Sequence, residues 1–567
     1  MAAATTVGMR DFLRWAAVIL GPDRGFFGLA IVYGLGVGLL SLATPISVQM
    51  LINSVANTAL PAPLFTLAAV LFAMLALQGV LNGLRLYVME LFRRRFFARL
   101  MAEATLRAVH ARNPFFQDER RGDLFNRFFD VMTVQKAMPS LLIGFFALVL
   151  QSAVGFVVTS FYHPVFLAFN LIVVLAVWLI WRVWSRGAMR TAVAQSHAKY
   201  AAAAWLESIG ASNGFYKSGR HLSFAMQRSE ALTARYVEEH GRHFRSSFAQ
   251  AAGFMALYAV ASASLLAMGG WLVIRGQLSL GQLVAAELIL SSIFFGIAQL
   301  GTYLDVFYDL VAAVEELNQL YDIPQEAHPP ALRPPAPMER SDLVLRDVRI
   351  GESRFDLTLP AGARLAASAE PGTERHFTRL LRRHLKPDAG LVILGGTDLA
   401  ALDVYQLRTE VVILDRPVIV EGRLRDYLTL AAPEAPAGAV LDVLDRTGLG
   451  RTVARLPEGL DTVVASTGWP LSPPEMMRLR LAAALLSQPR VLVLSPLFDV
   501  IPGEALAKAL AALGPRSTAV CFTNRPAELP VGAWLHLGKR RQVIVDTPAE
   551  LDRLAAEDRE HDHAVSA

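Results

Sequence analysis

Long uncharged stretches alternate with polar ones through the N-terminal part of the chain. No charged residue stands between Gly25 and Leu84. Residues 137–181 carry no charged residue either, apart from His163. A helix needs about 20 apolar residues to cross a bilayer, so each of these stretches holds two spans. The pattern predicts six spans in all, at residues 26–48, 64–84, 139–160, 164–181, 250–274 and 280–304.

Proline and positive charge organise these spans. Pro45 is expected to kink or end the first span, because proline lacks the amide hydrogen that a helix interior uses. Lys and Arg gather in residues 85–121 and 182–245, whereas the breaks near 53–63 and 161–164 carry neither. Positively charged loops remain in the cytoplasm, so the pattern predicts that both termini are cytoplasmic.

The two basic segments are much longer than a connection between spans needs to be, and we expect them to be helical extensions of the spans. Each contains a short break, one within residues 113–124 and one at 207–214. Paired loops of this kind suit docking onto a following domain. The candidate coupling residues are Phe116, Gly122, Asp123, Glu207 and Gly210.

Acidic residues are rare in the spans. Glu287 is the only charged residue in the sixth predicted span. A carboxylate inside a membrane is a functional candidate by default, so Glu287 either lines a transport pathway or lies close enough to the outer interface to be hydrated. Four later residues are expected to form a solvated face of the helical extension: Asp305, Asp309, Glu315 and Glu316.

The pattern changes after residue 340 to short apolar runs that alternate with amphipathic segments. The runs predict strands at residues 343–348, 364–367, 391–394, 411–414, 491–494 and 518–522, with helices at 374–384, 476–487 and 504–513. This alternation is typical of an α/β domain with a largely parallel sheet.

The predicted fold class is therefore a multi-domain membrane protein. A six-helix, all-α transmembrane domain with long intracellular extensions occupies residues 1–322. A Pro-rich linker follows at 323–340, then a cytoplasmic α/β domain at 341–555 and a polar tail at 556–567.

Composition agrees with this assignment. The chain is 54% hydrophobic and 18% charged, which is too apolar for a soluble enzyme of 567 residues. The net charge of +5 is modest, and no basic tract indicates a nucleic-acid partner. The single cysteine, Cys521, excludes a disulfide framework. No metal site is expected, and His561 and His563 are interpreted as part of a solvated tail.

Several phrases of the sequence point to a known architecture. They are Gly270-Trp-Leu-Val-Ile-Arg-Gly-Gln-Leu-Ser-Leu-Gly-Gln-Leu-Val284, Leu385-Lys-Pro-Asp-Ala-Gly390, Leu456-Pro-Glu-Gly-Leu-Asp-Thr-Val-Val464 and Leu481-Ala-Ala-Ala-Leu-Leu-Ser-Gln-Pro-Arg490. With six spans before an α/β domain, the chain resembles a half-transporter of the ATP-binding cassette (ABC) exporter family (type IV, B-family-like). It is most similar to the type I secretion and bacteriocin-exporter branch, without an N-terminal peptidase domain.

The resemblance implies a location in a bacterial inner membrane, surrounded by lipid. It also implies a homodimer, or a heterodimer with another ABC half-transporter, and a periplasmic adaptor as a further partner. A nucleic-acid partner is not expected.

The phosphate-loop position departs from the family. Where the family has glycines, then Lys and Ser or Thr, this chain has Pro371, Gly372, Thr373, Glu374, Arg375 and His376. Phosphate loops depend on open backbone N–H groups and on the Lys. Glu374 would instead place a negative charge beside the phosphates, and at about 4 Å this contact costs ~4 kcal/mol at an effective dielectric near 20. The alternative is an ordinary surface helix start with adjacent Glu and Arg.

The signature position also departs. Where the family has Leu-Ser-Gly-Gly-Gln, this chain has Leu471, Ser472, Pro473, Pro474 and Glu475. The two prolines remove N–H donors, and the glutamate adds a negative charge. The same residues also suit an ordinary helix start, because Pro and Glu are favoured in a first turn and Ser is a cap.

The remaining nucleotide positions lack the expected chemistry too. Leu414 stands at the switch-glutamine position, Ser495 and Pro496 stand where Asp and Glu would hold Mg²⁺ and polarise water, and Asn524 stands at the switch histidine. Leucine binds no Mg²⁺, and proline is not a general base.

The resemblance therefore implies an exporter subunit whose cassette is a pseudo-ATPase with no catalytic residue. ATP and Mg²⁺ would be cofactors only if the degenerate site still binds them. The substrate would be a peptide, a lipid or another amphiphile. The alternatives are a membrane scaffold or regulator that does not transport, and an active ATP-driven exporter.

Overall fold

The computed structural model describes residues 8–57, 62–112, 122–326, 341–539 and 541–566. Contacts divide the chain into two units, Met1–Glu326 and Ala327–Ala567. The division lies within the predicted linker.

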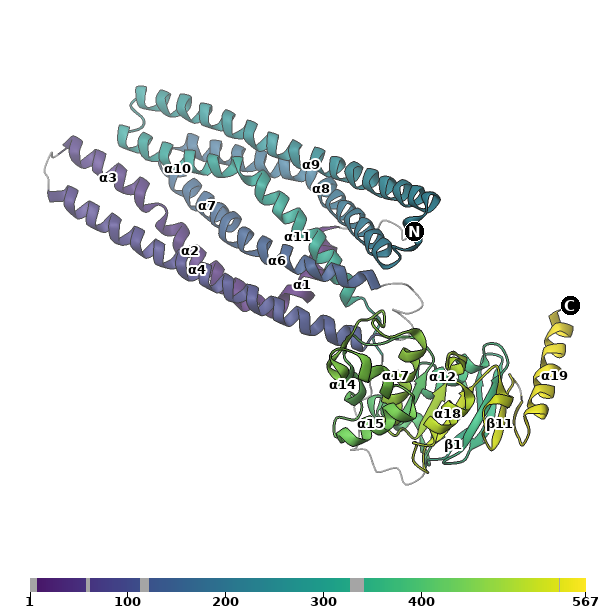
Figure 1. Ribbon diagram of the computed structural model, residues 1–567. Helices are drawn as coiled ribbons and strands as arrows, with labels where there is room; N and C mark the ends of the chain where they lie inside the picture. Colours follow the sequence, from purple (N-terminus) through teal and green to yellow (C-terminus); the bar gives the residue numbers. More distant parts are fainter. Residues whose placement is uncertain (1–7, 58–61, 113–121, 327–340, 540, 567) are drawn as a thin grey trace. The chain divides into compact units, whose positions relative to one another are not determined.

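The first unit is built of helices (Figure 1). They are α1 (Met9–Leu20), α2 (Arg24–Leu40), α3 (Ala43–Asn57), α4 (Ala62–Val109), α6 (Asp130–Pro139), α7 (Phe146–Ser160), α8 (Pro164–Ala211), α9 (Gly219–Ile274), α10 (Leu280–Ala298) and α11 (Leu300–Tyr321), with 3₁₀ turns η1 (Gly21–Asp23), η2 (Gly122–Phe129) and η4 (Phe215–Lys217) and a π-helical turn η3 (Ser140–Phe145). Among the described residues, six helical segments are long and apolar enough to cross a membrane. The predicted all-α transmembrane domain is confirmed.

Two predicted spans are divided. The first breaks between Leu40 and Ala43, so Pro45 lies in the first turn of α3. A proline is tolerated there because first-turn amides have no partner within the helix. The sixth breaks at Gln299, between α10 and α11.

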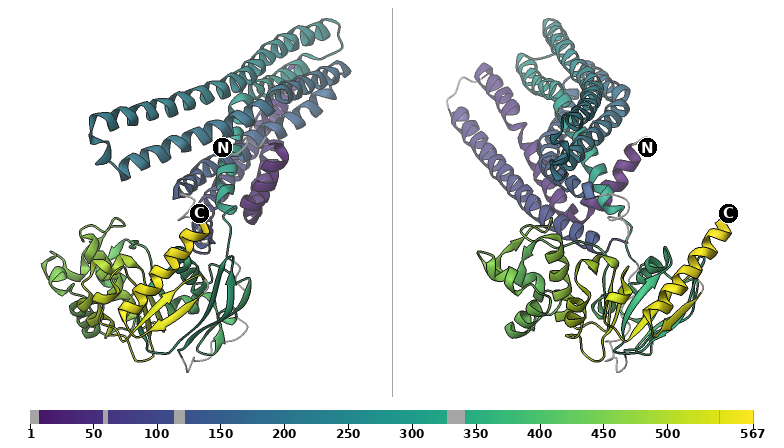
Figure 2. Two further views of the ribbon diagram at one scale, coloured as in Figure 1. Left: turned by 90° about the vertical axis from the view of Figure 1, so that its right-hand side faces the viewer. Right: turned by 45° about the vertical axis from the view of Figure 1, so that its right-hand side comes forward.

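The predicted helical extensions are present as α4, α8 and α9, which have 48, 48 and 56 residues. Helices α8 and α9 pack side by side as a long antiparallel pair (Figure 2). The prediction that the break includes Glu207 and Gly210 is wrong, because α8 continues to Ala211 and the turn follows it. Phe116 lies outside the described residues, and only the backbone is described for Gly122 and Asp123.

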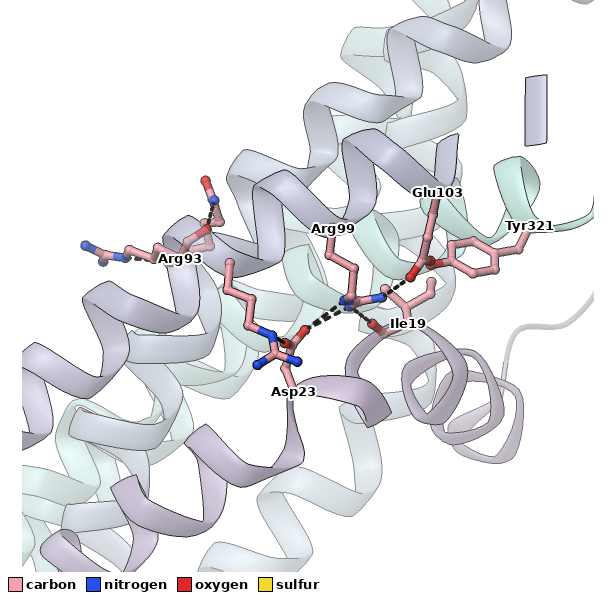
Figure 3. Close-up of polar contacts among 8 residues, drawn as sticks. Ile19, Asp23, Arg93, Arg99, Glu103 and Tyr321 are labelled. Carbon is pink, nitrogen blue, oxygen red and sulfur yellow. Dashed lines mark hydrogen bonds and ion pairs between the residues drawn. The ribbon is translucent and has the colours of Figure 1, made fainter. Parts of the chain in front are cut away.

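A buried carboxylate joins the N-terminal helix to two others (Figure 3). Asp23, between α1 and α2, is 1% exposed and accepts hydrogen bonds from Arg99 of α4 at 2.8 and 3.3 Å. Arg99 also donates to the carbonyl oxygen of Ile19 at 2.6 Å and to Glu103 at 2.8 Å. Glu103 accepts a hydrogen bond from the Tyr321 hydroxyl at the end of α11. This network fixes α1 and α11 to α4.

The predicted solvated face is wrong at Glu316, which is 0% exposed. Helix α11 packs against α6, α8 and η2, and Arg127 of η2 forms an ion pair with Glu316. Asp305 and Asp309 are exposed as expected, whereas Glu315 is partly buried.

The second unit contains a six-stranded sheet in the order β12-β11-β3-β10-β9-β6. Its strands are β3 (Arg364–Ala369), β6 (Val411–Leu414), β9 (Val491–Leu494), β10 (Thr518–Phe522), β11 (Ala533–Leu537) and β12 (Gln542–Val545). Only β12 is antiparallel to its neighbour, so the predicted α/β domain with a largely parallel sheet is confirmed.

Two predicted strands belong to a different, antiparallel sheet in the order β2-β1-β4-β5. Its strands are β1 (Leu343–Ile350), β2 (Ser353–Leu359), β4 (Ala389–Leu394) and β5 (Thr397–Asp398). The sequence analysis missed β2, which follows β1 after the two-residue turn of Gly351 and Glu352. Gly351 has φ +52, and a tight hairpin turn needs such a positive value. A further short pair joins β7 (Gly422–Arg423) to β8 (Val463–Val464).

Helices surround these sheets. They are α12 (Thr373–Leu381), α13 (Val404–Glu410), α14 (Leu424–Thr429), α15 (Ala437–Arg446), α16 (Gly450–Arg455), α17 (Pro473–Leu486), α18 (Gly503–Leu510) and α19 (Pro548–Ser566). Helix α12 helps to fill the core between the two larger sheets. Its Phe377 ring lies 6.3 Å from Phe355 of β2 and 6.2 Å from Phe522 of β10. The start of α12 is therefore placed by a packed core.

The Asp23 network yields a stability prediction. Removal of one partner from a buried ion pair costs roughly 3–5 kcal/mol, because the other charge stays buried without compensation. We expect Asp23→Asn to lower the unfolding temperature of the purified full-length protein markedly. The matched control is Glu238→Gln, which breaks the exposed pair of Glu238 with Arg242 and should cost below about 1 kcal/mol. Equal shifts for the two variants would contradict the structural role of Asp23.

Candidate functional site

The loop between β3 and α12 closes on itself. Strand β3 remains paired with β11 as far as Ala369. In the next four residues, the Thr373 N–H donates to the carbonyl oxygen of Glu370 at 3.0 Å. Pro371 and Gly372 occupy the centre of this turn, and Gly372 has φ +86. A type II turn has this geometry, with proline first and a left-handed glycine second. The phosphate-loop position is therefore a tight turn.

Side chains hold this turn in place. Glu370 accepts hydrogen bonds from the Lys539 ammonium group at 2.9 Å and from the Lys539 backbone N–H at 2.6 Å. Inside the turn, Thr373 is 1% exposed, and its hydroxyl has no hydrogen bond within the described part of the chain. His376 Nδ1 lies 2.9 Å from the Ser353 hydroxyl, and Arg375 is exposed.

Glu374 is partly buried in the first turn of α12. Burial, together with the nearby negative charge of Asp415, raises the pKa of its carboxyl group to about 7. Asp415 follows Leu414 at the end of β6 and lies 3.4 Å from Arg382 Nη1. Arg382 also donates to the carbonyl oxygen of Ile413. The residue at the position predicted for a phosphate-binding Lys is thus a carboxyl group with a raised pKa.

Neither Arg382 nor Asp415 was predicted from the sequence. An acidic residue directly after a buried strand was the available signal for Asp415, since the carboxyl ends of β6, β9 and β3 share one edge of the sheet. The position of Arg382 depends on how α12 packs, and no local pattern indicates it.

The positions expected for Mg²⁺ and water activation lie at this same sheet edge. Leu414 is 7% exposed, and its carbonyl oxygen accepts a hydrogen bond from the Ser495 N–H at 3.2 Å. Ser495 is 6% exposed, and its hydroxyl has no hydrogen bond among the described residues. Pro496 begins the 3₁₀ turn η7 (Pro496–Val500).

A nearby carboxylate that the sequence analysis missed, Asp499, already has a backbone partner. Its Oδ2 accepts a hydrogen bond from the Asn524 N–H at 2.9 Å. The side chain of Asn524 is exposed. Asp499 therefore connects η7 to the segment after β10.

The signature position forms the N-terminus of α17. Glu475 Oε2 accepts hydrogen bonds from the Ser472 N–H at 2.9 Å and from the Ser472 hydroxyl at 2.6 Å, and Oε1 accepts one from Thr452 at 2.8 Å. These hydrogen bonds, chiefly those from Ser472, lower the pKa of the Glu475 carboxyl group. The arrangement corresponds to a capping box, in which the third helical residue reaches back to the cap. The described hydrogen bonds of residues 471–475 stay in this region and do not reach the turn at 370–373.

In the membrane unit, Glu287 is partly buried on α10. Its Oε1 accepts a hydrogen bond from the Ser291 hydroxyl at 2.9 Å, and its Oε2 is buried without a hydrogen bond among the described residues. One turn further, Gln151 of α7 donates to the Ser292 hydroxyl at 3.0 Å. Gln151 and Ser292 therefore form a polar contact between α7 and α10.

Comparison with known proteins agrees with this architecture. Residues 27–209 match the ABC transporter transmembrane region. The chain is 23% identical over 485 residues to the Toxin RTX-I translocation ATP-binding protein of Actinobacillus pleuropneumoniae, an alignment covering 83% of this chain and 68% of the relative. It is 22% identical, with the same coverage, to the Leukotoxin translocation ATP-binding protein LktB of Mannheimia haemolytica.

Among solved structures, a bacterial Atm1-family ABC exporter with ATP bound has a similar fold. The TM-score is 0.78 at 19% identity, and the match covers 94% of this chain and 98% of that one. The chain is therefore a multi-pass membrane protein with the ABC exporter fold, and the predicted resemblance is confirmed.

The raised pKa of Glu374 yields a prediction about pH. The ordinary pKa of a glutamate is 4.5, and the pKa of Glu374 in the fold is about 7. As pH rises, the carboxyl group therefore loses its proton in the unfolded chain before it does so in the fold. The stability of the fold falls as pH rises between these two values. We expect Glu374→Gln to be more stable than the wild type by about 1–2 kcal/mol near pH 8, a figure discounted for partial solvent screening, and nearly equal near pH 5.

Chemical unfolding of the full-length protein at both pH values measures this difference. Glu434→Gln, which changes an exposed glutamate of the same unit, is the control and should show no such pH dependence. A Glu374→Gln variant that is less stable than the wild type near pH 8 would contradict the burial argument.

Proposed function

We propose that this chain is a subunit of an ABC exporter-type transporter whose cassette is a pseudo-ATPase. In this proposal the cassette is a scaffold for dimerisation and coupling, in a bacterial inner membrane with both termini cytoplasmic. The observation that carries the proposal is that groups of the chain itself occupy the positions where the family binds phosphate.

At the phosphate-loop position, one backbone donor is already used and another is missing. Helix N-termini bind anions because their first amides have no partner within the helix. Here the Thr373 N–H already donates to Glu370, and Pro371 has no N–H to offer. Glu374 replaces the attractive Lys by a carboxyl group that becomes negative above about pH 7. A triphosphate would have to open the turn and face this charge.

The signature position already holds an anion. The Glu475 carboxylate accepts hydrogen bonds at the start of α17, where the family places its γ-phosphate. Its lowered pKa means that it stays ionised at neutral pH. A second anion there would meet a like charge as well as the two prolines that follow Ser472.

The groups that would hold Mg²⁺ and activate water are absent from their expected positions. Phosphoryl transfer needs a cradle, a metal ion, a positioned water and positive charge together. The family uses carboxylate, amide and imidazole side chains at these positions. Leu414, Ser495 and Pro496 carry none of these groups, and Asn524 carries an amide where the family has an imidazole. The residues present do not fit Mg·ATP, and no cofactor is assigned to this chain.

A partner cassette does not simply repair these losses. In this family each nucleotide site lies between the phosphate loop of one cassette and the signature of the other. In one site, the phosphate loop of a competent partner would therefore face Glu475 of this chain. In the other site, the signature of the partner would face Glu374 of this chain. Both composite sites are impaired in the proposed dimer, whether it is homomeric or heteromeric.

Two features favour a retained transport role over a purely structural one. Two relatives are named for the translocation of a toxin and a leukotoxin, and the proposed substrate of this chain is a peptide, a lipid or another amphiphile. Glu287, Gln151 and Ser292 also keep polar groups within the membrane helices, where an inert scaffold would not need them.

Glu207 and Gly210, at the end of α8, remain the proposed coupling residues together with Phe116, Gly122 and Asp123.

Nucleotide turnover tests the proposal. We expect the purified full-length protein in lipid nanodiscs to show no Mg²⁺-dependent ATP hydrolysis above the level of matched Glu374→Ala and Glu475→Ala preparations. Glu374→Lys alone should not create activity, because the signature and metal positions stay altered. Hydrolysis by the wild type that is lost in Glu374→Ala would overturn the pseudo-ATPase assignment.

A further inference from the structure

Three side chains from distant parts of the membrane unit converge outside the predicted spans. His197 of α8 places Nε2 3.0 Å from Glu315 Oε2 and 3.8 Å from Glu316 Oε1, both on α11. One ligand atom from each residue lies within 4.8 Å of the other two. His197 and Glu315 are 118 residues apart in the chain, so no local spacing motif reveals this cluster.

The other carboxylate oxygens are held by neighbouring donors. Gln319 Nε2 donates to Glu315 Oε1 at 3.1 Å and to Glu316 Oε2 at 3.3 Å. Arg127 of η2 forms its ion pair with the same Glu316 Oε2. These contacts fix the carboxylates so that Glu315 Oε2 and Glu316 Oε1 face His197. Metal ligands are commonly oriented in this way by outer hydrogen bonds.

Glu316 Oε1 is the atom that a hydrogen-bond network alone leaves unexplained. The Glu316 side chain is 0% exposed, and Oε1 has no hydrogen-bond partner among the described residues. A protonated His197 Nε2 can donate a hydrogen bond to Glu315 Oε2 at 3.0 Å. Glu316 Oε1, which lies 3.8 Å from the same nitrogen, then still has no hydrogen bond. A cation between the three atoms would satisfy both carboxylates.

We propose that His197, Glu315 and Glu316 form a binding site for a divalent transition-metal ion of the Zn²⁺ or Mn²⁺ class. An ion about 2.1 Å from each ligand in tetrahedral geometry needs ligand atoms about 3.4 Å apart, and the two measured separations bracket that value. One imidazole and two carboxylates suit these ions better than Ca²⁺ or Mg²⁺, which prefer oxygen ligands alone.

Charge and access agree with this assignment. Two carboxylates and Arg127 leave a net charge of −1 when His197 is neutral, which attracts a cation. The His197 side chain is 44% exposed, so an ion can reach the site from solvent, and water can complete its coordination. The bound ion would connect α8 to α11, the last helix of the unit, whatever the nucleotide chemistry of the cassette.

Metal content tests the site. The full-length protein is stripped with chelator and dialysed against Zn²⁺ alone or Mn²⁺ alone. We expect about one ion per chain from a site with three protein ligands. Loss of one ligand in His197→Ala should weaken binding at least ~10-fold and remove the ion-dependent rise in unfolding temperature. Glu315→Gln, which keeps the buried pair of Glu316 with Arg127, is the second ligand variant.

His240→Ala is the matched control, because His240 is exposed on α9 and stacks on Tyr236 outside the cluster. It should bind the ion as the wild type does. The proposal is overturned if the wild type binds neither ion, or if His197→Ala and Glu315→Gln bind with unchanged stoichiometry and affinity.

Discussion

A backbone N–H that is already hydrogen-bonded within the chain is not available to bind an anion. This constraint applies at the starts of two helices of the cassette. At α12 the acceptor is the carbonyl oxygen of Glu370, and at α17 it is the carboxylate of Glu475. The bonded N–H of the buried Thr373 stabilises the fold, because an unpaired buried amide costs about 1–3 kcal/mol. The same satisfaction works against nucleotide binding. We infer that the cassette is built to be stable without ligand.

The architecture is held by hydrophobic packing, in which the motif positions Leu414 and Leu471 take part as ordinary core residues. Phe377 on α12 packs between β2 and β10, and the central strands β9 and β10 are buried along their whole length. In the membrane unit, the buried carboxylates of Asp23 and Glu316 form ion pairs with Arg99 and Arg127 of other elements. All of these contacts are made by residues of the chain itself.

Much of this was accessible from sequence because its signals are local. Apolar runs located the six spans, and strand periodicity located the central parallel strands. The turn after Glu370 has a local signal in Pro371 and Gly372, but its anchor was not accessible, since Lys539 is 169 residues from Glu370. The separate antiparallel sheet and the burial of Glu316 were missed for the same reason: each depends on which element packs against which. At the first span the error is smaller. Pro45 was predicted to kink or end this span, and helix α2 ends five residues earlier, at Leu40.

Hydrogen–deuterium exchange of the full-length protein, with and without millimolar Mg·ATP, tests the central claim most directly. Amides at the starts of α12 and α17 that are already bonded within the chain should exchange at the same slow rates in both conditions. The account predicts no change in peptides covering residues 368–378 and 470–478. ATP-dependent protection of either peptide would show that these helix starts still bind phosphate and would contradict the account.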